Sequence, residues 1–260
     1  MNGSLKSLFD LTGQTAIITG GSRGLGLQIA TALGEYGCCL ALVARKQAEL
    51  DEAVAMLGDR GMTAAAFVAD LANPEASEAL VSSIMARFGR IDVLVNNAGT
   101  TWGGAAEDFP LEGWNKVIDL NVTSMFALTQ SVARAAFIPQ GGGSVINVAS
   151  ILGLVGTPHW QTGTVAYNAA KGAVISMTRA LAAEWGPKNI RVNALAPGFF
   201  PSKMTAAAIE QSGDRMIELT PLGKLGGETD LMGPALLLAS AAGGHMTGQV
   251  IVVDGGYTIV

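Results

Sequence analysis

The sequence predicts a doubly wound α/β fold in which helices cover both faces of a seven-stranded parallel sheet. Seven short runs rich in apolar and β-branched residues recur along the 260 residues, as buried strands do. They are residues 15–19, 38–43, 63–68, 91–95, 144–148, 190–195 and 249–253. Between most of them, apolar residues recur at helical spacing, as at Leu25, Ile29 and Leu33, over stretches long enough to cross a sheet. This alternation indicates parallel strands covered by helices on both faces.

A single domain is expected to span residues 1–260, because no linker, repeat or low-complexity tract divides the chain. The alternation of strands and helices is interrupted at about residues 198–227, where Pro201, Pro221 and several glycines surround a short helical stretch. We expect this segment to form a lid over a substrate site.

The composition disfavours several function classes. The chain is 49% hydrophobic and 14% charged, and its formal charge of −5 leaves no basic surplus for nucleic acid or an anionic membrane. Residues 1–10 lack the regions of a signal peptide, and no apolar run could span a bilayer, so a cytoplasmic location is expected. Cys38 and Cys39 are adjacent in an apolar run and fit strand residues better than metal ligands. With only two histidines as well, no metal site is expected.

The segment T-G-G-S-R-G-L-G, residues 19–26, follows the first predicted strand and opens directly into an apolar-periodic helix. Gly20, Gly24 and Gly26 would let the backbone approach a pyrophosphate, whose charge a helix N-terminus favours. The spacing G-x-x-x-G-x-G differs from the common G-x-G-x-x-G, and an ordinary glycine-rich turn is the alternative. The position after the first strand, where dinucleotide-binding folds hold the phosphates, favours a nucleotide site.

The end of the second predicted strand bears on the choice of nicotinamide cofactor. NAD-preferring sites place Asp or Glu there to hold the ribose 2′-hydroxyl, whereas this chain has Ala44, Arg45 and Lys46. Arg45, together with Arg23 of the glycine-rich turn, could donate charge-assisted hydrogen bonds to a 2′-phosphate. NADP(H) is therefore favoured over NAD(H), the alternative being that Arg45 merely faces water at the start of a helix.

Tyr167 and Lys171 are candidates for proton transfer to a carbonyl oxygen, because they lie four residues apart in a predicted helix and share a face. Hydride attack on a ketone leaves negative charge on its oxygen, and a positioned acid must meet that oxygen. A free phenol has a pKa near 10, and the neighbouring ammonium is expected to lower it. Alone the pair is weak evidence, because a surface lysine beside a packed ring has the same spacing.

Further motifs occur in order along the chain and make this pair more specific. They are N-N-A-G at 96–99, Asn121, Ser150 at the end of a strand, P-G at 197–198 and V-D-G-G at 253–256. In combination with the glycine-rich turn, they resemble the short-chain dehydrogenase/reductase family over nearly the whole chain. The resemblance implies a Rossmann-like fold, assembly into a homo-tetramer or dimer, and hydride transfer between NADP(H) and a small-molecule carbonyl or secondary alcohol.

The resemblance also assigns site residues. Ser150 would hydrogen-bond the substrate oxygen, and Tyr167 would act as general acid in reduction. Lys171 would also hold the nicotinamide ribose, and Asn121 would maintain a water-linked proton relay. The cofactor-binding residues implied by the turn and the resemblance are Gly20, Ser22, Arg23, Gly24, Leu25, Gly26, Arg45, Asp70, Leu71, Asn97, Ala98, Gly99, Tyr167, Lys171, Pro197, Gly198, Phe200 and Ser202.

One segment departs from the family's pattern. Ser150 and Tyr167 are 17 residues apart, whereas the family usually separates the pair by about four fewer, a difference that loops tolerate. The extra residues lie in 156–164, and this insertion is expected to shape the substrate pocket. It adds the hydroxyls of Thr157, Thr162 and Thr164 as alternatives to Ser150, which stays favoured because it ends a strand. His159 is expected to be an exposed loop residue without a role.

Several side chains suggest an apolar pocket for a lipid-like or aromatic carbonyl: Trp102, Phe199, Phe200, Met204, Ile209 and Met216. A core-facing helical stripe is an equally good interpretation of the last two. Within the family, segments 96–103 and 197–205 resemble 3-oxoacyl-thioester reductases, the class favoured here, and gluconate-type sugar-acid dehydrogenases. A non-catalytic NADP(H)-binding regulator and a relative adapted to dehalogenation or dehydration are further alternatives. A regulator or a dehalogenase would be expected to lose the lysine or the cofactor glycines, which this chain keeps.

Overall fold

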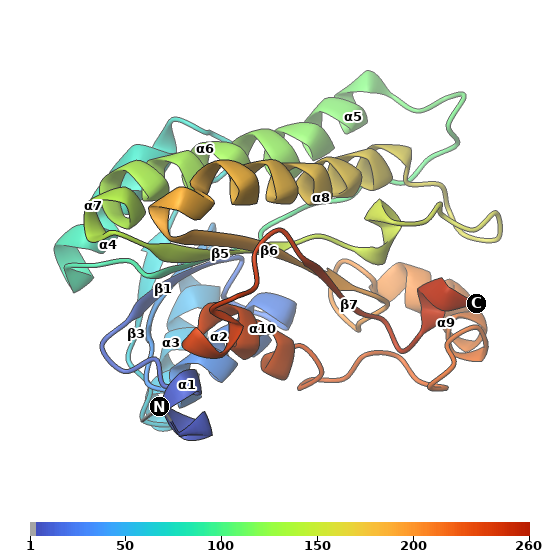
Figure 1. The fold of residues 1–260 in the computed structure, drawn as a ribbon. Coiled ribbons are helices and arrows are strands. Elements are labelled where there is room, and N and C mark those ends of the chain that lie inside the picture. The colour runs from blue at the N-terminus through green and yellow to red at the C-terminus, as the bar shows by residue number, and fades with distance from the viewer. Residues whose placement is uncertain (1–3) are drawn as a thin grey trace.

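The computed structural model describes residues 4–260 and forms a seven-stranded parallel sheet with the strand order β3-β2-β1-β4-β5-β6-β7 (Figure 1). The strands are β1 (Thr15–Thr19), β2 (Cys39–Ala44), β3 (Ala64–Val68), β4 (Val93–Asn96), β5 (Gly143–Val148), β6 (Ile190–Pro197) and β7 (Val250–Val253). All seven predicted strands are confirmed, and their boundaries differ from the prediction by no more than two residues at either end.

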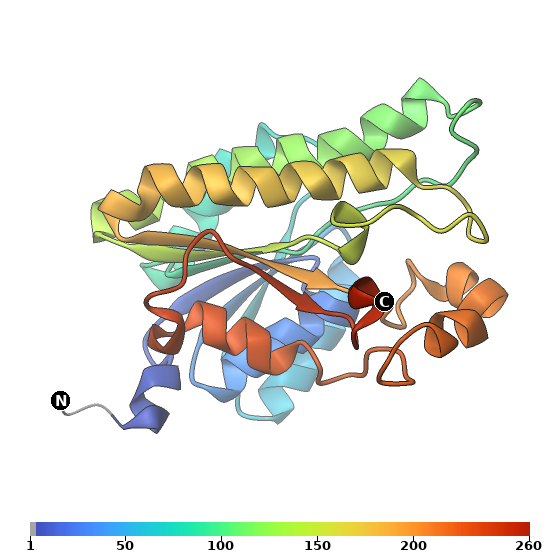
Figure 2. The ribbon, with the colours of Figure 1, turned by 45° about the vertical axis from the view of Figure 1, so that its right-hand side comes forward.

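Helices cover both faces of this sheet, as Figures 1 and 2 show. The α-helices of residues 4–260 are α1 (Leu5–Phe9), α2 (Gly24–Glu35), α3 (Gln47–Asp59), α4 (Ala76–Phe88), α5 (Leu111–Ile118), α6 (Met125–Val132), α7 (Ile138–Gln140), α8 (Val165–Trp185), α9 (Ala206–Glu218) and α10 (Met232–Ala239). The layer of α2, α3 and α10 lies on one face, and the layer of α4, α6 and α8 lies on the other. The predicted doubly wound, Rossmann-like fold is therefore confirmed.

Successive residues of each strand alternate between these two layers, and β1 illustrates this. Ile18 packs among residues of α2 and α10, whereas Ile17 packs among residues of α4 and α6, and both side chains are fully buried. Burying a side chain of this size contributes about 1.5–3 kcal/mol. Since both faces of the central strands are covered, their sequences are continuously apolar, which is the pattern that predicted buried strands.

The chain reverses direction across the sheet at β1, which has β2 on one side and β4 on the other. The turns that follow β1 and β4 therefore diverge and leave a crevice at the carboxyl ends of the strands. At the base of this crevice, Thr19 Oγ1 accepts hydrogen bonds from the N–H groups of Asn97 and Ala98, each at 2.9 Å. Asn97 Nδ2 in turn donates to the Thr19 carbonyl oxygen at 2.9 Å. These bonds fix the two turns relative to each other.

Three further sequence expectations concern the packing of the cysteines, membrane-spanning helices and metal-binding clusters. Cys38 is buried and Cys39 begins β2, so both pack in the strand region, and burial raises the pKa of the Cys38 thiol. Among the helices of residues 4–260, none combines the length and apolarity needed to cross a bilayer. In that same part of the chain, no three His, Cys, Asp or Glu side chains gather closely enough to hold a metal ion.

Gly26, in the first turn of α2, provides a test of the close packing at the crevice. An added methyl group there would overlap the Gly20 carbonyl oxygen and the Asn97 side-chain amide. We expect Gly26→Ala to lose about 1–3 kcal/mol of unfolding free energy in urea denaturation, the usual cost of overpacking. Gly58→Ala in α3 is the matched control, because open space surrounds Gly58, and it should gain about 0.5–1 kcal/mol. Equal effects of the two substitutions would contradict the close approach.

Candidate active site

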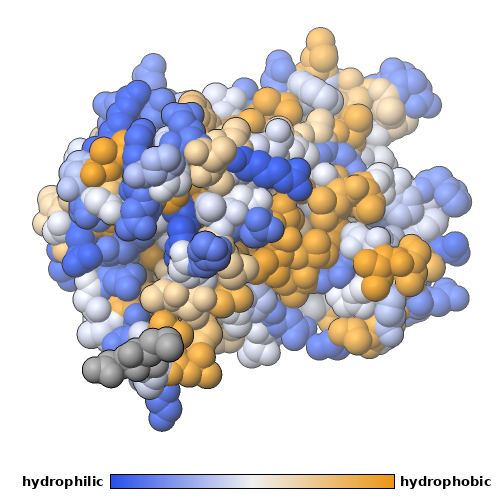
Figure 3. All heavy atoms as spheres, viewed as in Figure 1, coloured by the Kyte–Doolittle hydropathy of each residue, from blue (hydrophilic) through white to orange (hydrophobic). Residues whose placement is uncertain are grey.

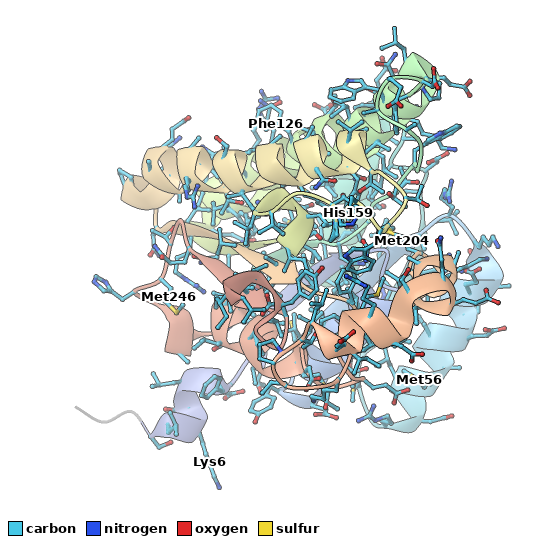
Figure 4. All side chains as sticks on the ribbon, turned by 90° about the vertical axis from the view of Figure 1, so that its right-hand side faces the viewer. Lys6, Met56, Phe126, His159, Met204 and Met246 are labelled. Atoms are coloured by element: carbon cyan, nitrogen blue, oxygen red, sulfur yellow. The ribbon has the colours of Figure 1, made fainter. Side chains whose placement is uncertain are left out.

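A cleft of about 970 Å³ opens at the carboxyl edge of the sheet, the edge that faces the viewer in Figure 4. Its walls come from the turns after the strands, the segment 156–164 and the loop and helix around α9. The predicted residues that line it are Gly20, Ser22, Arg23, Gly24, Leu25, Arg45, Asp70, Leu71, Asn97, Ala98, Gly99, Ser150, Tyr167, Lys171, Pro197, Gly198, Phe200 and Ser202. Of the predicted set, Gly26 and Asn121 lie behind its wall. The structure therefore brings nearly all the predicted residues to one cavity.

The glycine-rich turn forms the middle of the cleft floor. Gly20 adopts a positive φ of 64°, and a Cβ there would come within 2.8 Å of the Asn97 amide nitrogen. Arg23 is the N-cap of α2 but makes no side-chain cap hydrogen bond, and no acidic residue lies in the first turn. The N-terminal N–H groups are thus left for an anion, and the positive end of the helix dipole favours one. This turn fits the pyrophosphate of a dinucleotide.

One end of the cleft, beside β2 and α3, is rich in charge. Arg23, Arg45 and Lys46 all line it. Glu49 in α3 lines it too, and its Oε1 accepts from Arg23 Nη1 at 2.9 Å and from Lys46 Nζ at 3.1 Å. The hydrogen bond from Lys46 is the main cause that lowers the Glu49 pKa. Sequence reasoning considered Arg23 and Arg45 but missed Glu49; its i, i+3 spacing from Lys46 was the available signal.

At the opposite end of the cleft, Ser150 and Tyr167 present their hydroxyl groups together. Ser150 follows β5 with an extended backbone, φ −168° and ψ 157°, and its Oγ accepts from the N–H of Leu152 at 3.1 Å. Tyr167 lies in the first turn of α8. Burial raises the pKa of Tyr167 to about 12, while a hydrogen bond with Ser150 acts in the opposite direction. A carbonyl oxygen placed between these two groups would meet two hydroxyl donors.

Lys171 lies one turn beyond Tyr167 in α8 and is only 3% exposed. Its Nζ donates to the Val148 carbonyl oxygen at 2.6 Å and lies 5.5 Å from the centroid of the Tyr167 ring. Burial lowers the pKa of Lys171 to about 8. The expectation that this ammonium lowers the Tyr167 pKa is therefore wrong for the protein without cofactor. The ammonium points to a backbone carbonyl instead of the phenol oxygen, and burial of the phenol dominates.

Asn121 lies behind the cleft wall in a π-helical turn, Asp119–Ser124, which joins α5 to α6. Its side chain is fully buried, accepts from the Thr100 N–H at 2.8 Å and donates to the Thr100 carbonyl oxygen at 2.9 Å. A Cβ on Gly99 would lie 3.1 Å from Asn121 Oδ1 and 3.9 Å from Lys171 Nζ. Asn121 therefore holds the loop after β4 close to the buried ammonium, and Gly99 leaves the room between them.

The inserted segment 156–164 is fastened to α8 by Asn168, a residue that sequence reasoning missed. The hydroxyls of Thr157 and Thr164 both donate to Asn168 Oδ1 at 2.9 Å. On the other side, the Gly104 N–H donates to the Gly163 carbonyl oxygen at 2.9 Å. Because Asn168 already engages the two threonine hydroxyls, Ser150 is the better placed partner for a substrate oxygen. His159, labelled in Figure 4, lies in this segment and is not among the residues that line the cleft.

The substrate end of the cleft has one mostly polar wall and one mostly apolar wall. Gln161 lines the polar wall, and its Nε2 is buried without a hydrogen-bond partner. In the segment before α9, Phe199, Phe200 and Met204 line the cleft as expected, and Figure 4 labels Met204. Trp102, Ile209 and Met216 do not line it: Trp102 packs across Gly113, and Met216 is fully buried. The apolar pocket inferred from sequence is therefore smaller than expected, because those side chains pack elsewhere.

The family model described as "Enoyl-(Acyl carrier protein) reductase" matches residues 20–258. Curated relatives include gluconate 5-dehydrogenase of Gluconobacter oxydans, 36% identical with 97% of each chain covered. They also include 2-dehydro-3-deoxy-D-gluconate 5-dehydrogenase of Dickeya dadantii, 39% identical over 96% of this chain and 97% of the relative.

Two solved structures match nearly the whole fold. A short-chain type dehydrogenase/reductase from Mycobacterium marinum has a TM-score of 0.94 and 36% identity, covering 99% of this chain and 100% of its own. A gluconate 5-dehydrogenase from Burkholderia cenocepacia in complex with NADP and tartrate has a TM-score of 0.93 and 33% identity, with the same coverage. With the cleft, the glycine-rich turn and the Ser150–Tyr167–Lys171 cluster in one chain, these matches place the protein in the short-chain dehydrogenase/reductase family of oxidoreductases.

Proposed function

We propose that this oxidoreductase transfers hydride between NADP(H) and a carbonyl or secondary alcohol carbon, with Tyr167 as the general acid in reduction. The observation that carries the proposal is the pair of neighbouring hydroxyls of Ser150 and Tyr167 beside a buried lysine. The pair lies at one end of a cleft whose middle is a phosphate-binding turn. In the proposed complex, a dinucleotide held on that turn places its nicotinamide beside the hydroxyl pair.

Each residue of the cluster has a proposed role. When bound, the nicotinamide supplies or accepts the hydride. Ser150 hydrogen-bonds the substrate oxygen, and Tyr167 donates its proton to that oxygen as negative charge develops there. Lys171 donates to the Val148 carbonyl. It supplies positive charge near the Ser150 and Tyr167 hydroxyls and a hydrogen-bond donor for the nicotinamide ribose. Asn121 fixes the Thr100 backbone beside Lys171 and is the proposed anchor of a water-linked proton relay.

The preference for NADP(H) over NAD(H) is supported by the charge at the other end of the cleft. Arg23, Arg45 and Lys46 line that end, and no Asp or Glu ends β2 to hold a ribose 2′-hydroxyl. Guanidinium groups bond phosphate oxygens in fixed, often bidentate geometry. The complex of the Burkholderia cenocepacia relative with NADP is consistent with this choice.

For the substrate, we propose a hydroxylated acid of the gluconate type. The supporting observation is Gln161, which lines the cleft together with Thr157, Thr162 and Thr164 and whose Nε2 is buried without a hydrogen-bond partner. An unpaired buried donor costs about 1–3 kcal/mol, and a substrate oxygen would satisfy it. Two of the relatives reported above are named as gluconate or deoxygluconate dehydrogenases.

A 3-oxoacyl thioester, the class favoured by the sequence, is the second candidate substrate. The apolar lid wall of Phe199, Phe200 and Met204 supports it, because an acyl chain gains free energy on leaving water. A 3-oxoacyl-[acyl-carrier-protein] reductase of Chlamydia muridarum is 36% identical to this chain. A purely binding role would leave the Ser150–Tyr167–Lys171 cluster without use, and a dehalogenase would be expected to lose the lysine or the cofactor glycines, which this chain keeps.

We also propose that the chain acts in the cytoplasm as one domain, with residues 198–227 as the substrate lid, and that it assembles as a tetramer or dimer. Large apolar side chains exposed at the sheet edge and C-terminal end support the assembly, and Figure 3 shows an apolar area over this face. They are those of Leu222, Val252, Ile259 and Val260.

Removing the Tyr167 hydroxyl tests the proposed acid directly. We expect Tyr167→Phe to lower kcat about 10²–10⁴-fold, the usual contribution of a positioned general acid. The Kd for NADPH, measured by fluorescence titration, should change by less than about twofold, since the ring that packs in the site is kept. Activity is measured as NADPH oxidation with a panel of ketones, 3-oxoacyl thioesters and keto sugar acids. Undiminished turnover in the variant would overturn the mechanism.

The pKa of Tyr167 sets the expected pH dependence. In alcohol oxidation Tyr167 must accept a proton and so must be a phenolate, whose fraction rises about tenfold per pH unit below a pKa of about 12. Initial rates of oxidation should therefore rise with pH between 6 and 9. Initial rates of reduction need the protonated phenol and should not rise over that range. A pH-independent oxidation rate, measured at saturating substrate and NADP⁺, would be inconsistent with Tyr167 as the base.

Gln161→Leu tests the substrate proposal. Loss of the amide donor should raise KM for gluconate about tenfold, the equivalent of about 1.4 kcal/mol and of one hydrogen bond to a polar substrate. Cyclohexanol, which is oxidised in the same direction and has no second oxygen, is the control substrate, and its KM should stay within about twofold. Equal KM changes for both substrates, or none for gluconate, would remove Gln161 from substrate recognition.

A further inference from the structure

The carboxylate of Glu49 lies inside the group of cations that the proposed function assigns to the 2′-phosphate. Glu49 is in the first turn of α3, and its side chain is 28% exposed, less than that of Arg23 at 52% or Lys46 at 64%. One oxygen, Oε1, takes hydrogen bonds from both of these cations. The two cations therefore converge on an anion that belongs to the protein itself.

The charges around this carboxylate come from separate parts of the chain. Arg23 precedes α2, Lys46 precedes α3, and Lys203 of the lid segment also contributes to lowering the Glu49 pKa. Arg45 lines the same end of the cleft. Three cations thus act on one carboxylate, and the lowered pKa keeps that group ionised at neutral pH. These cations can bind an anion, and the Glu49 carboxylate already occupies that position.

We propose that Glu49 is an internal competitor of the cofactor's 2′-phosphate and sets how strongly the protein prefers NADP(H) over NAD(H). This inference rests on the proposed use of NADP(H). A phosphate monoester carries a charge of about −1.5 to −2 at neutral pH. When it draws Arg23 and Lys46 to itself, it weakens their bonds to Glu49, and it then lies beside a like charge. NADH has a neutral hydroxyl at this position and meets neither cost.

Glu49 therefore lowers the affinity for NADP(H) selectively. The cations alone would favour NADP(H) strongly, and the carboxylate reduces that preference without abolishing it. The usual acid that favours NAD stands at the end of the second strand. Glu49 instead stands one helical turn into α3 and acts through the cations, so its effect is expected on the phosphate-bearing cofactor.

The experiment compares Kd values of the full-length protein for NADPH and NADH by fluorescence titration, with no substrate and no turnover. Glu49→Gln keeps the shape of the side chain and removes the charge. Glu52→Gln is the matched control, because Glu52 is exposed on the same helix, is not among the cleft-lining residues and changes the net charge equally. We expect Glu49→Gln to tighten NADPH binding about fivefold, the upper range for exposed charge pairs, and to leave NADH within about twofold. The difference should shrink at 1 M salt.

Three results would overturn the proposal: NADPH binding changed no more than in Glu52→Gln, NADPH binding weakened, or NADH binding tightened as much as NADPH binding. Arg45→Asp tests the underlying cofactor assignment separately. It should shift the ratio of the two Kd values toward NADH, and an unchanged ratio would reject the 2′-phosphate role of Arg45. If Glu49→Gln fails to tighten NADPH binding but Arg45→Asp shifts the Kd ratio, the role of Glu49 is rejected and the NADP(H) assignment is kept. The two failures are therefore distinguishable.

Discussion

The hydrogen bonds between Thr19 and Asn97 are the constraint on which the site depends. They join the turn after β1 to the turn after β4 at the point where the strand order reverses. Asn97 also donates to the Gly20 carbonyl, and the start of α2 lies so close to these two groups that only glycine fits at position 26. The phosphate-binding turn and the loop that leads to Asn121 are therefore fixed in one unit.

Burial determines the chemistry at the opposite end of the cleft. Burial lowers the pKa of Lys171, whose ammonium donates to one backbone carbonyl, and the same burial raises the pKa of Tyr167. A cofactor that brings positive charge to this pocket would favour the phenolate and oppose the effect of burial. The protonation of the pair is thus expected to depend on which form of the nicotinamide is bound.

The sequence was sufficient to predict the sheet because its central strands are continuously apolar and glycines punctuate the first turn. The specific order of Ser150, Tyr167 and Lys171 along the chain also predicted a shared site, and the structure brings the three residues to one cleft. The sequence was not sufficient for Glu49, Gln161 or Asn168, because their roles depend on contacts made only in the fold. Glu49 accepts hydrogen bonds from two cations, Gln161 has a buried amide nitrogen without a partner, and Asn168 accepts from two threonine hydroxyls. The expected lowering of the Tyr167 pKa also failed, because spacing along a helix gives proximity but neither burial nor the direction of the ammonium.

In the proposed complex, one cleft aligns a dinucleotide, with its phosphates on the glycine-rich turn and its nicotinamide against the hydroxyl pair. A crystal structure of the protein with NADP⁺ tests this arrangement. We expect the pyrophosphate at the N-terminus of α2, the 2′-phosphate among Arg23, Arg45 and Lys46, and the nicotinamide ring beside the Tyr167 hydroxyl. A nicotinamide ring bound away from Ser150 and Tyr167 would contradict it.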